Sequence, residues 1–200
     1  MMAALIPPGV ICGNKVPTIS FPNDPSDDRL FLWLAIVNSL PFDWLLRRIV
    51  TTTVNYFVLL SLRLPNLDIS SLPAQRLIGL ARKLLELDQS KNSSFENVWR
   101  IAELRCEADV LVARAYGCSE DDLRLMLRDF PLLDRGQPAI QGETSSTITE
   151  DVLLSAWLRN AETGNEQSAQ RVERARKLGA IPYVSSEFVS SIQEKSNEVG

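Results

Sequence analysis

The residue types that most often carry enzyme chemistry are scarce in this sequence. It contains no histidine, which excludes histidine acid–base catalysis, Ser–His and Cys–His nucleophile pairs and histidine-ligated metals. Its three cysteines, Cys12, Cys106 and Cys118, form no Cys-x-x-Cys pair, which argues against a cysteine zinc site and a disulfide framework. The sequence therefore offers no support for nucleophilic or zinc-dependent catalysis.

Acidic clusters and glycine-rich loops are the remaining candidates for a catalytic or cofactor site. Glu120–Asp122 stands at the expected start of a helix, where carboxylates complement the helix dipole, and this role explains the cluster better than a divalent metal site. Turn formation and helix capping explain Asp24, Asp27 and Asp28 in the same way. None of the nine glycines makes a dinucleotide or phosphate loop, so we expect no cofactor and no metal in this chain.

Side chains suited to DNA contact gather where an expected helix ends near residue 50. Arg47 and Arg48 end this helix, and a polar run follows at 51–55. Arginine cations suit phosphates, and hydroxyl and amide groups suit phosphates and base edges. The alternative is that the two arginines only complement the dipole at the end of their own helix. The residues that we expect to contact DNA are Arg47, Arg48, Thr51, Thr52, Thr53, Asn55, Asn14, Lys15 and Arg135.

Composition and charge narrow the class of protein further. The chain has 200 residues, a 45% hydrophobic fraction and a net charge of −4, so bulk charge does not attract it to nucleic acid. Residues 1–65 carry a balance of +1 and residues 66–200 one of −5, which favours the first part as a DNA-facing surface. The longest apolar run, Leu30–Val37, is far short of a membrane span, and we expect a cytoplasmic protein.

The elements that must position these residues are expected to form an α+β protein in two parts. Residues 1–65 form a small mixed part, with short strands within 3–21 and a strand within 51–58, because these segments are rich in β-branched and apolar residues. Residues 66–200 form a mainly helical part, in which Ser71, Ser93 and Ser119 are expected to cap helices. The expected helices are 28–39, 41–49, 72–87, 95–117, 119–129, 149–161, 166–178 and 187–194.

Three segments in order carry a resemblance to a known family. They are Ala4-Leu5-Ile6-Pro7-Pro8-Gly9-Val10, then Asn38-Ser39-Leu40-Pro41-Phe42-Asp43-Trp44, and finally Ala113-x-x-Tyr116-Gly117 followed by Asp129-Phe130-Pro131-Leu132. With them the chain resembles, over about residues 4–157, the C-terminal target-recognition and helical region of large adenine-specific DNA methyltransferases. These are the enzymes of restriction-modification and phage-defence systems, of the type IIG, BREX and DISARM kind.

The resemblance implies recognition of double-stranded DNA for a separate catalytic chain, either a larger methyltransferase or a restriction subunit. S-adenosylmethionine would bind to that partner, because the Asn/Asp-Pro-Pro-aromatic motif of such enzymes is missing. The only Pro-Pro pair, Pro7-Pro8, lies between Ile6 and Gly9. Two alternatives stay open: a structural subunit that completes a partner's sheet through Ala3–Val10 without binding DNA, and a metal-dependent nuclease.

Overall fold

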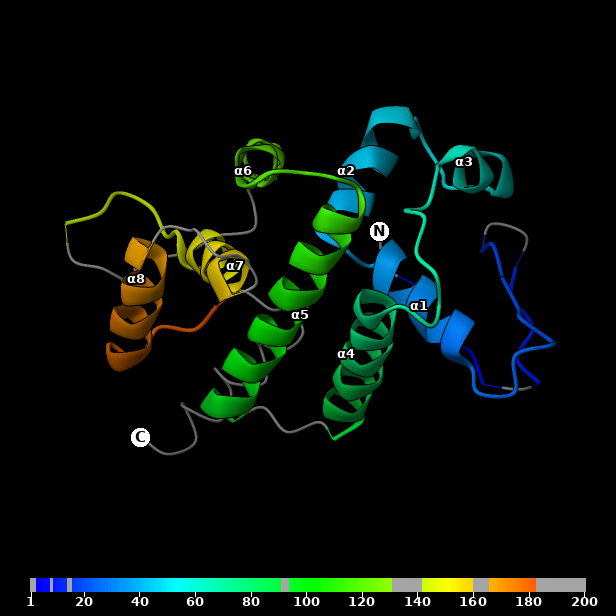
Figure 1. Cartoon of the computed structure of the whole chain (residues 1–200), viewed down its shortest axis with the longest axis horizontal. Helices are drawn as coiled ribbons and strands as arrows, with labels where there is room; N and C mark the ends of the chain where they lie inside the picture. The colour runs from blue at the N-terminus through cyan, green and yellow to red at the C-terminus, as the bar shows by residue number, and fades with distance from the viewer. Residues whose placement is uncertain are drawn as a thin grey trace.

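A computed structural model describes residues 3–7, 9–13, 16–90, 94–130, 142–159 and 166–182. In these residues the chain is helical and contains no strand, so the predicted α+β class is wrong (Figure 1). The helices are α1 (Asp28–Val37), α2 (Leu40–Ile49), α3 (Tyr56–Ser61), α4 (Leu72–Gln89), α5 (Phe95–Ala115), α6 (Glu120–Arg128), α7 (Ile148–Arg159) and α8 (Glu166–Lys177).

The two regions expected to form strands contain none in the described residues, for different reasons. In the predicted strand at 51–58, the Asn55 side chain accepts a hydrogen bond from the backbone N–H of Val58 at 3.0 Å and starts α3 instead. The described residues before α1 have no regular secondary structure, and no backbone ladder joins them to another described segment. A strand is stable only beside a partner, so β-propensity alone does not create one.

The helices predicted from capping residues and apolar periodicity are confirmed, with ends that differ by a few residues. The hydroxyls of Ser39 and Ser71 accept hydrogen bonds from the third residue of α2 and of α4. Ser119 forms a reciprocal capping box with Asp122 at the start of α6. The predicted helix at 187–194 lies outside the described residues.

Two predicted caps differ in detail. The long helix α5 is capped by Ser94 and not by Ser93, and the Ser94 hydroxyl accepts from the N–H of Asn97. Asp27 stands at the N-cap of α1 with a left-handed backbone, and its side chain makes no capping hydrogen bond. The carboxylate of Asp24 accepts instead from the N–H of Arg29 at 2.6 Å. A residue outside the helix therefore accepts the hydrogen bond of an N–H in its first turn.

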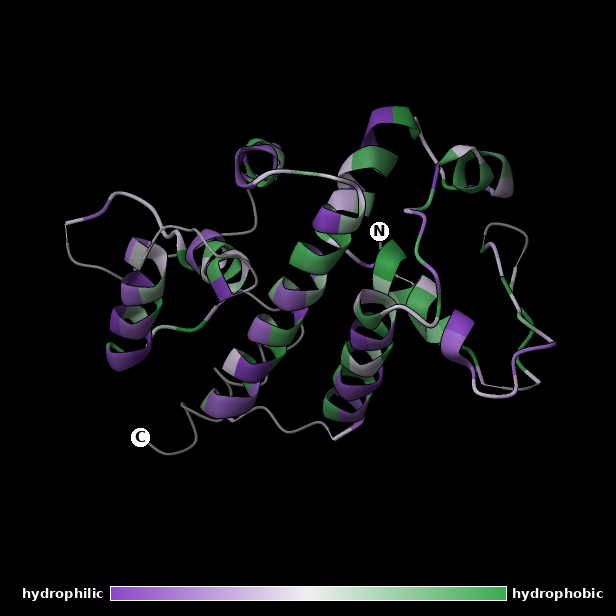
Figure 2. Ribbon diagram, viewed as in Figure 1, coloured by the Kyte–Doolittle hydropathy of each residue, from purple (hydrophilic) through white to green (hydrophobic). Residues whose placement is uncertain are grey.

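The long helix α5 lies at the centre, with α1 and α4 on one side and α7 and α8 on the other (Figure 1). Leu104, Ala108 and Val112 of α5 are buried against α1 and α4. Trp99 and Val110 lie on the other side, in a second core shared with α6, α7 and α8. Figure 2 shows the outer helix α8 mostly hydrophilic and α1 mostly hydrophobic, in keeping with this arrangement.

The core that includes α1 also includes α4 and α5, and therefore spans residues on both sides of position 65. The division into residues 1–65 and 66–200 stays a prediction. No single helix of the described residues is long and apolar enough to cross a membrane. Only α1 and α2 taken together, across a bend of 65°, reach the required length and hydropathy.

Gly117 and Gly79 give a stability test with opposite signs. Gly117 ends α5 at φ +77°, a conformation that costs an L-residue about 1–2 kcal/mol, whereas Gly79 lies inside α4. A Cβ atom at either position would meet no atom within 4 Å, so backbone conformation alone decides the effect. Urea unfolding should show Gly117→Ala destabilised by about 1 kcal/mol and Gly79→Ala stabilised by about 0.5–1 kcal/mol. Equal signs for the two variants would contradict this account of how α5 ends.

Candidate functional site

The N-terminal segment (described residues 3–7, 9–13 and 16–22) is extended and runs outside the helices on the right of Figure 1. Within the segment, the N–H of Val10 donates to the carbonyl of Pro7 at 3.4 Å, and Gly9 has φ +84°. Exposure then alternates along residues 16–21, where Pro17, Ile19 and Phe21 are partly buried and the residues between them are exposed. This period of two is typical of an extended chain with one face on the protein.

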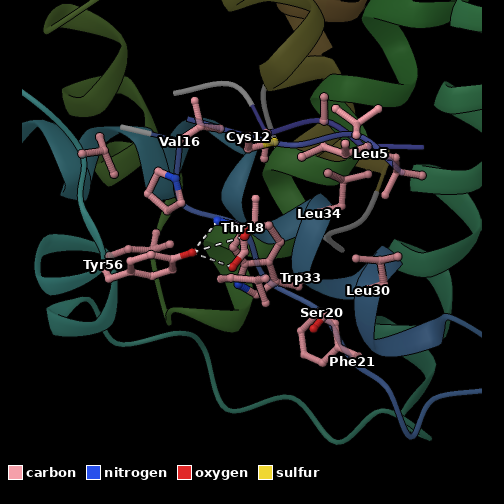
Figure 3. A pocket seen from close by; sticks show the side chains of 18 of the residues that line it. Leu5, Cys12, Val16, Thr18, Ser20, Phe21, Leu30, Trp33, Leu34 and Tyr56 are labelled. Atoms are coloured by element: carbon pink, nitrogen blue, oxygen red, sulfur yellow. Dashed lines mark hydrogen bonds between the residues drawn. The ribbon is translucent and has the colours of Figure 1, made fainter. Parts of the chain in front are cut away.

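Two side chains tether this segment to the helical body. The amide of Asn38, at the end of α1, accepts from the N–H of Ala3 at 2.7 Å and donates to its carbonyl at 2.9 Å. The phenol of Tyr56, in α3, accepts from the N–H of Thr18 at 2.7 Å and donates to its carbonyl at 2.9 Å (Figure 3). Hydrogen bonds with the side chain and backbone of Thr18 hold the pKa of Tyr56 below its ordinary value. Each side chain thus satisfies both backbone groups of one residue, as a neighbouring strand would.

Between the tethers the segment and the body enclose a hollow of about 1050 Å³. Leu30, Trp33 and Leu34 of α1 form one wall, and the segment with Tyr56 forms the others (Figure 3). Asp27 is the only charged residue among the described ones that line it. The described residues that line the hollow therefore favour apolar groups over charged ones.

The segment and α3 expose many large apolar side chains. Ile11 is 96% exposed, Phe57 89% and Leu60 77%. We define the N-terminal apolar surface as these three residues together with the four other exposed apolar residues of the same elements: Ile6, Val10, Val16 and Tyr56. Single exposed apolar residues are ordinary, but a set gathered on two tethered elements is typical of an interaction site.

The backbone of the segment is also unpaired along much of its length. The N–H groups of Leu5, Ile6, Ile11 and Cys12 donate to no acceptor among the described residues. An extended backbone with free donors and acceptors is a template for pairing with another chain.

Of the residues expected to contact DNA, Arg47 and Arg48 lie at the exposed end of α2, but both are paired within the chain. The Nε of Arg47 donates to Asp43 at 3.1 Å, and its guanidinium lies over the Phe130 ring, 4.7 Å from the centroid. Arg48 forms an ion pair with Asp129 and lies over the Trp44 ring, 4.5 Å from the centroid.

The indole N–H of Trp44 donates to the same carboxylate of Asp129 at 2.7 Å, so this group joins α2 to the end of α6. Neighbouring acids therefore compensate the charge of both arginines before any phosphate approaches. Arg47 and Arg48 thus form ion pairs with Asp43 and Asp129, in addition to lying at the C-terminal end of their own helix.

The other predicted DNA contacts divide into three groups. Thr51, Thr52 and Thr53 are exposed in the loop after α2, and Thr53 also borders the hollow. Asn55 is the cap of α3, so its side-chain oxygen is already engaged. The remaining predicted contacts lie outside the described residues: Asn14, Lys15 and Arg135.

Sequence reasoning missed a second site at Asp109. The Asp109 carboxylate, on α5, points to the start of α2 and accepts from the N–H of Leu40 at 2.7 Å. Burial raises the pKa of this carboxyl to about 7, against the lowering effects of the Leu40 hydrogen bond and the charge of Arg105. The only sequence signal was its place beside the apolar stripe of Cys106 and Val110.

The described residues contain no group of three or more Cys, Asp or Glu side chains that could hold a metal ion. No protein family, curated protein or solved structure matches the chain.

The tether at Tyr56 can be tested by removing one oxygen atom. Tyr56→Phe keeps the ring but loses both hydrogen bonds to Thr18, and a hydrogen bond of this kind contributes about 0.5–1.5 kcal/mol. Amide hydrogen exchange at Thr18 should become about tenfold faster, with exchange in α4 and α5 unchanged. Tyr116→Phe is the matched control, because that phenol donates to the carbonyl of Arg63 in another loop. Unchanged exchange at Thr18 would show that Tyr56 does not hold the segment.

Proposed function

We propose that the chain is a non-catalytic subunit that docks on a larger protein chain through its N-terminal apolar surface. One observation carries the proposal: an extended segment that exposes apolar side chains and also unpaired backbone groups. A chain that needed neither partner nor ligand would gain stability by covering both.

The partner that fits this segment best is the open edge of a β-sheet. Strand addition uses main-chain hydrogen bonds for affinity and alternate side chains for specificity. The described residues 3–6 and 10–13 form no helix, and the N–H groups of Leu5, Ile6, Ile11 and Cys12 donate to no acceptor among the described residues. A flat helical surface on the partner would use the apolar side chains but leave these N–H groups without acceptors.

The resemblance described above supplies the class of partner. We infer a cytoplasmic assembly in which the larger chain carries the adenine methyltransferase domain and binds S-adenosylmethionine. The helical body would then hold the docked segment in a fixed position relative to that domain. This interpretation makes the chain part of a restriction-modification or phage-defence system without giving it a reaction of its own.

Capture of the tagged chain from its native host tests the docking surface with paired variants. Ile11→Pro removes the N–H that strand pairing needs, whereas Ile11→Val keeps it at nearly the same apolar area. Ile11→Gln removes the apolar contact, and Leu125→Gln is its control because Leu125 is 53% exposed on α6.

The expected result is a methyltransferase chain that co-purifies with the wild type, Ile11→Val and Leu125→Gln. Its recovery should fall by about tenfold or more with Ile11→Pro and Ile11→Gln, because loss of a central contact typically costs over 1.4 kcal/mol. A partner recovered equally with all variants would place docking elsewhere. Recovery lost with Ile11→Gln but kept with Ile11→Pro would exclude strand addition.

DNA recognition at the end of α2 is the second candidate function. It is favoured by one observation: Arg47 and Arg48 are more than half exposed and are followed by three exposed threonines. Phosphates would have to compete with Asp43 and Asp129 for the two guanidinium groups, so binding would be weak in the free chain.

Fluorescence anisotropy with labelled duplex DNA at two salt concentrations tests this candidate. The double variant Arg47→Ala, Arg48→Ala should reduce the salt slope by about 2, since each phosphate contact contributes about one unit. Asp43→Asn and Asp129→Asn should strengthen binding, because they release the two arginines. Arg174→Ala, on the exposed side of α8, should have no effect. Weaker binding by the two asparagine variants would contradict a phosphate role for these arginines.

A further inference from the structure

We propose that the hollow between the N-terminal segment and α1 is a binding site for an uncharged, apolar small molecule. The hollow borders the N-terminal apolar surface and shares some residues with it, but its ligand is a small molecule and not the partner chain. The proposal therefore does not depend on the docking function.

α1 is apolar on two of its faces, and only one of them is fully buried. Leu32 and Ile36 are buried in the core with α4 and α5. Leu30, Trp33 and Leu34 line the hollow and are only partly buried (Figure 3). A helix that is apolar all round is normally buried on every side, so this second face favours an apolar neighbour.

The two tethers hold the segment in place without closing it onto α1. Asn38 binds Ala3 and Tyr56 binds Thr18, and no backbone–backbone hydrogen bond joins the described residues between these two points to α1. The space that remains has a volume of about 1050 Å³. Water finds few hydrogen-bonding partners on walls of apolar side chains, so an apolar molecule that displaces it is stabilised by the burial of both surfaces.

The size of the hollow favours a small molecule over a single side chain of a partner. Sites for small molecules have volumes of roughly 300–1,000 Å³ and walls of mostly apolar and aromatic side chains. The hollow lies at the upper end of this range, and Phe21, Trp33 and Tyr56 are among the residues that line it. One inserted side chain would fill only a small part of this volume and would leave most of the apolar wall in contact with water.

The charges around the hollow favour a neutral ligand. Asp27 is the only charged residue among the described ones that line it, and it is exposed at the N-cap of α1. The hydroxyls of Thr18 and Tyr56 lie 3.3 Å apart and are engaged with each other. An anion would meet the carboxylate of Asp27 without a basic group among the described lining residues to compensate it, and its desolvation would oppose binding.

Two leucines separate this site from the docking surface. Leu30 lines the hollow but is not part of the N-terminal apolar surface, whereas Leu60 belongs to that surface and does not line the hollow. Both lie in helices, so Leu30→Gln and Leu60→Gln make the same chemical change at the two places.

Fluorescence titration of the full chain with N-phenyl-naphthylamine tests the site, because this uncharged probe becomes brighter in apolar surroundings. The expected result is one bound probe per chain with a Kd below about 100 µM. Leu30→Gln should weaken binding by about tenfold, since it removes an apolar side chain from the wall, and Leu60→Gln should leave the Kd unchanged. The sulfonated derivative of the probe has the same rings and a negative charge, and it should bind about tenfold more weakly or less.

NMR of the wild-type chain places the probe even where Leu30→Gln does not fold. Contacts between the probe and the methyl groups of Leu34 should appear as nuclear Overhauser effects, and their absence would overturn the proposal. Equal affinity for the charged and uncharged probes would overturn it too, as would an equal loss of affinity with Leu30→Gln and Leu60→Gln.

Capture of the partner chain with Leu30→Gln distinguishes this site from the proposed function. Partner recovery that stays at the wild-type level with Leu30→Gln, while the variant loses the probe, would support two separate ligands. Recovery that falls with Leu30→Gln as it does with Ile11→Gln would assign the hollow to the partner and overturn the small-molecule site. Probe binding without any captured partner would sink the docking function and leave this site standing.

Discussion

The structure depends on one helix that buries two faces at once. α5 presents Leu104, Ala108 and Val112 to α1 and α4, and Trp99 and Val110 to α6, α7 and α8. Opposite stripes of this one helix therefore face two separate cores, and α2 also reaches both, with Phe42 in the first core and Leu40 and Trp44 against the second. A side chain placed between the stripes, as Asp109 is, therefore meets elements from both sides.

Structure that depends on neighbouring residues could be predicted from the sequence. Contacts between segments that are far apart in the sequence could not. Ser71 and Ser119 cap their helices as predicted because capping involves a hydroxyl and an N–H only three residues away. The strand at 51–58 was predicted from composition, but a strand also needs a neighbour, and Asn55 started a helix instead. The cleft at Asp109 brings together four separate segments, so no spacing along the chain could reveal it.

The two arginines of α2 show what residue type alone can and cannot predict about phosphate binding. Arg47 and Arg48 have the chemistry and the exposure that phosphate binding requires, and the sequence shows both. It does not show that Asp129, 81 positions away, shares one carboxylate between Arg48 and the Trp44 indole. Whether such a cation is available to a ligand depends on this competition, which only the folded chain defines. The predicted contacts at Asn14, Lys15 and Arg135 lie outside the described residues and stay predictions.

The two tethers of the N-terminal segment have a consequence for how fast a partner could be exchanged. Asn38 and Tyr56 each hold one residue of the segment, and the helical cores contain little of it. Releasing the segment therefore breaks a few solvent-accessible hydrogen bonds and leaves the packing of α1, α4 and α5 intact. The activation barrier for such a release is independent of the barrier to global unfolding. A change that strengthens the core would leave the lifetime of the tethered state unaltered.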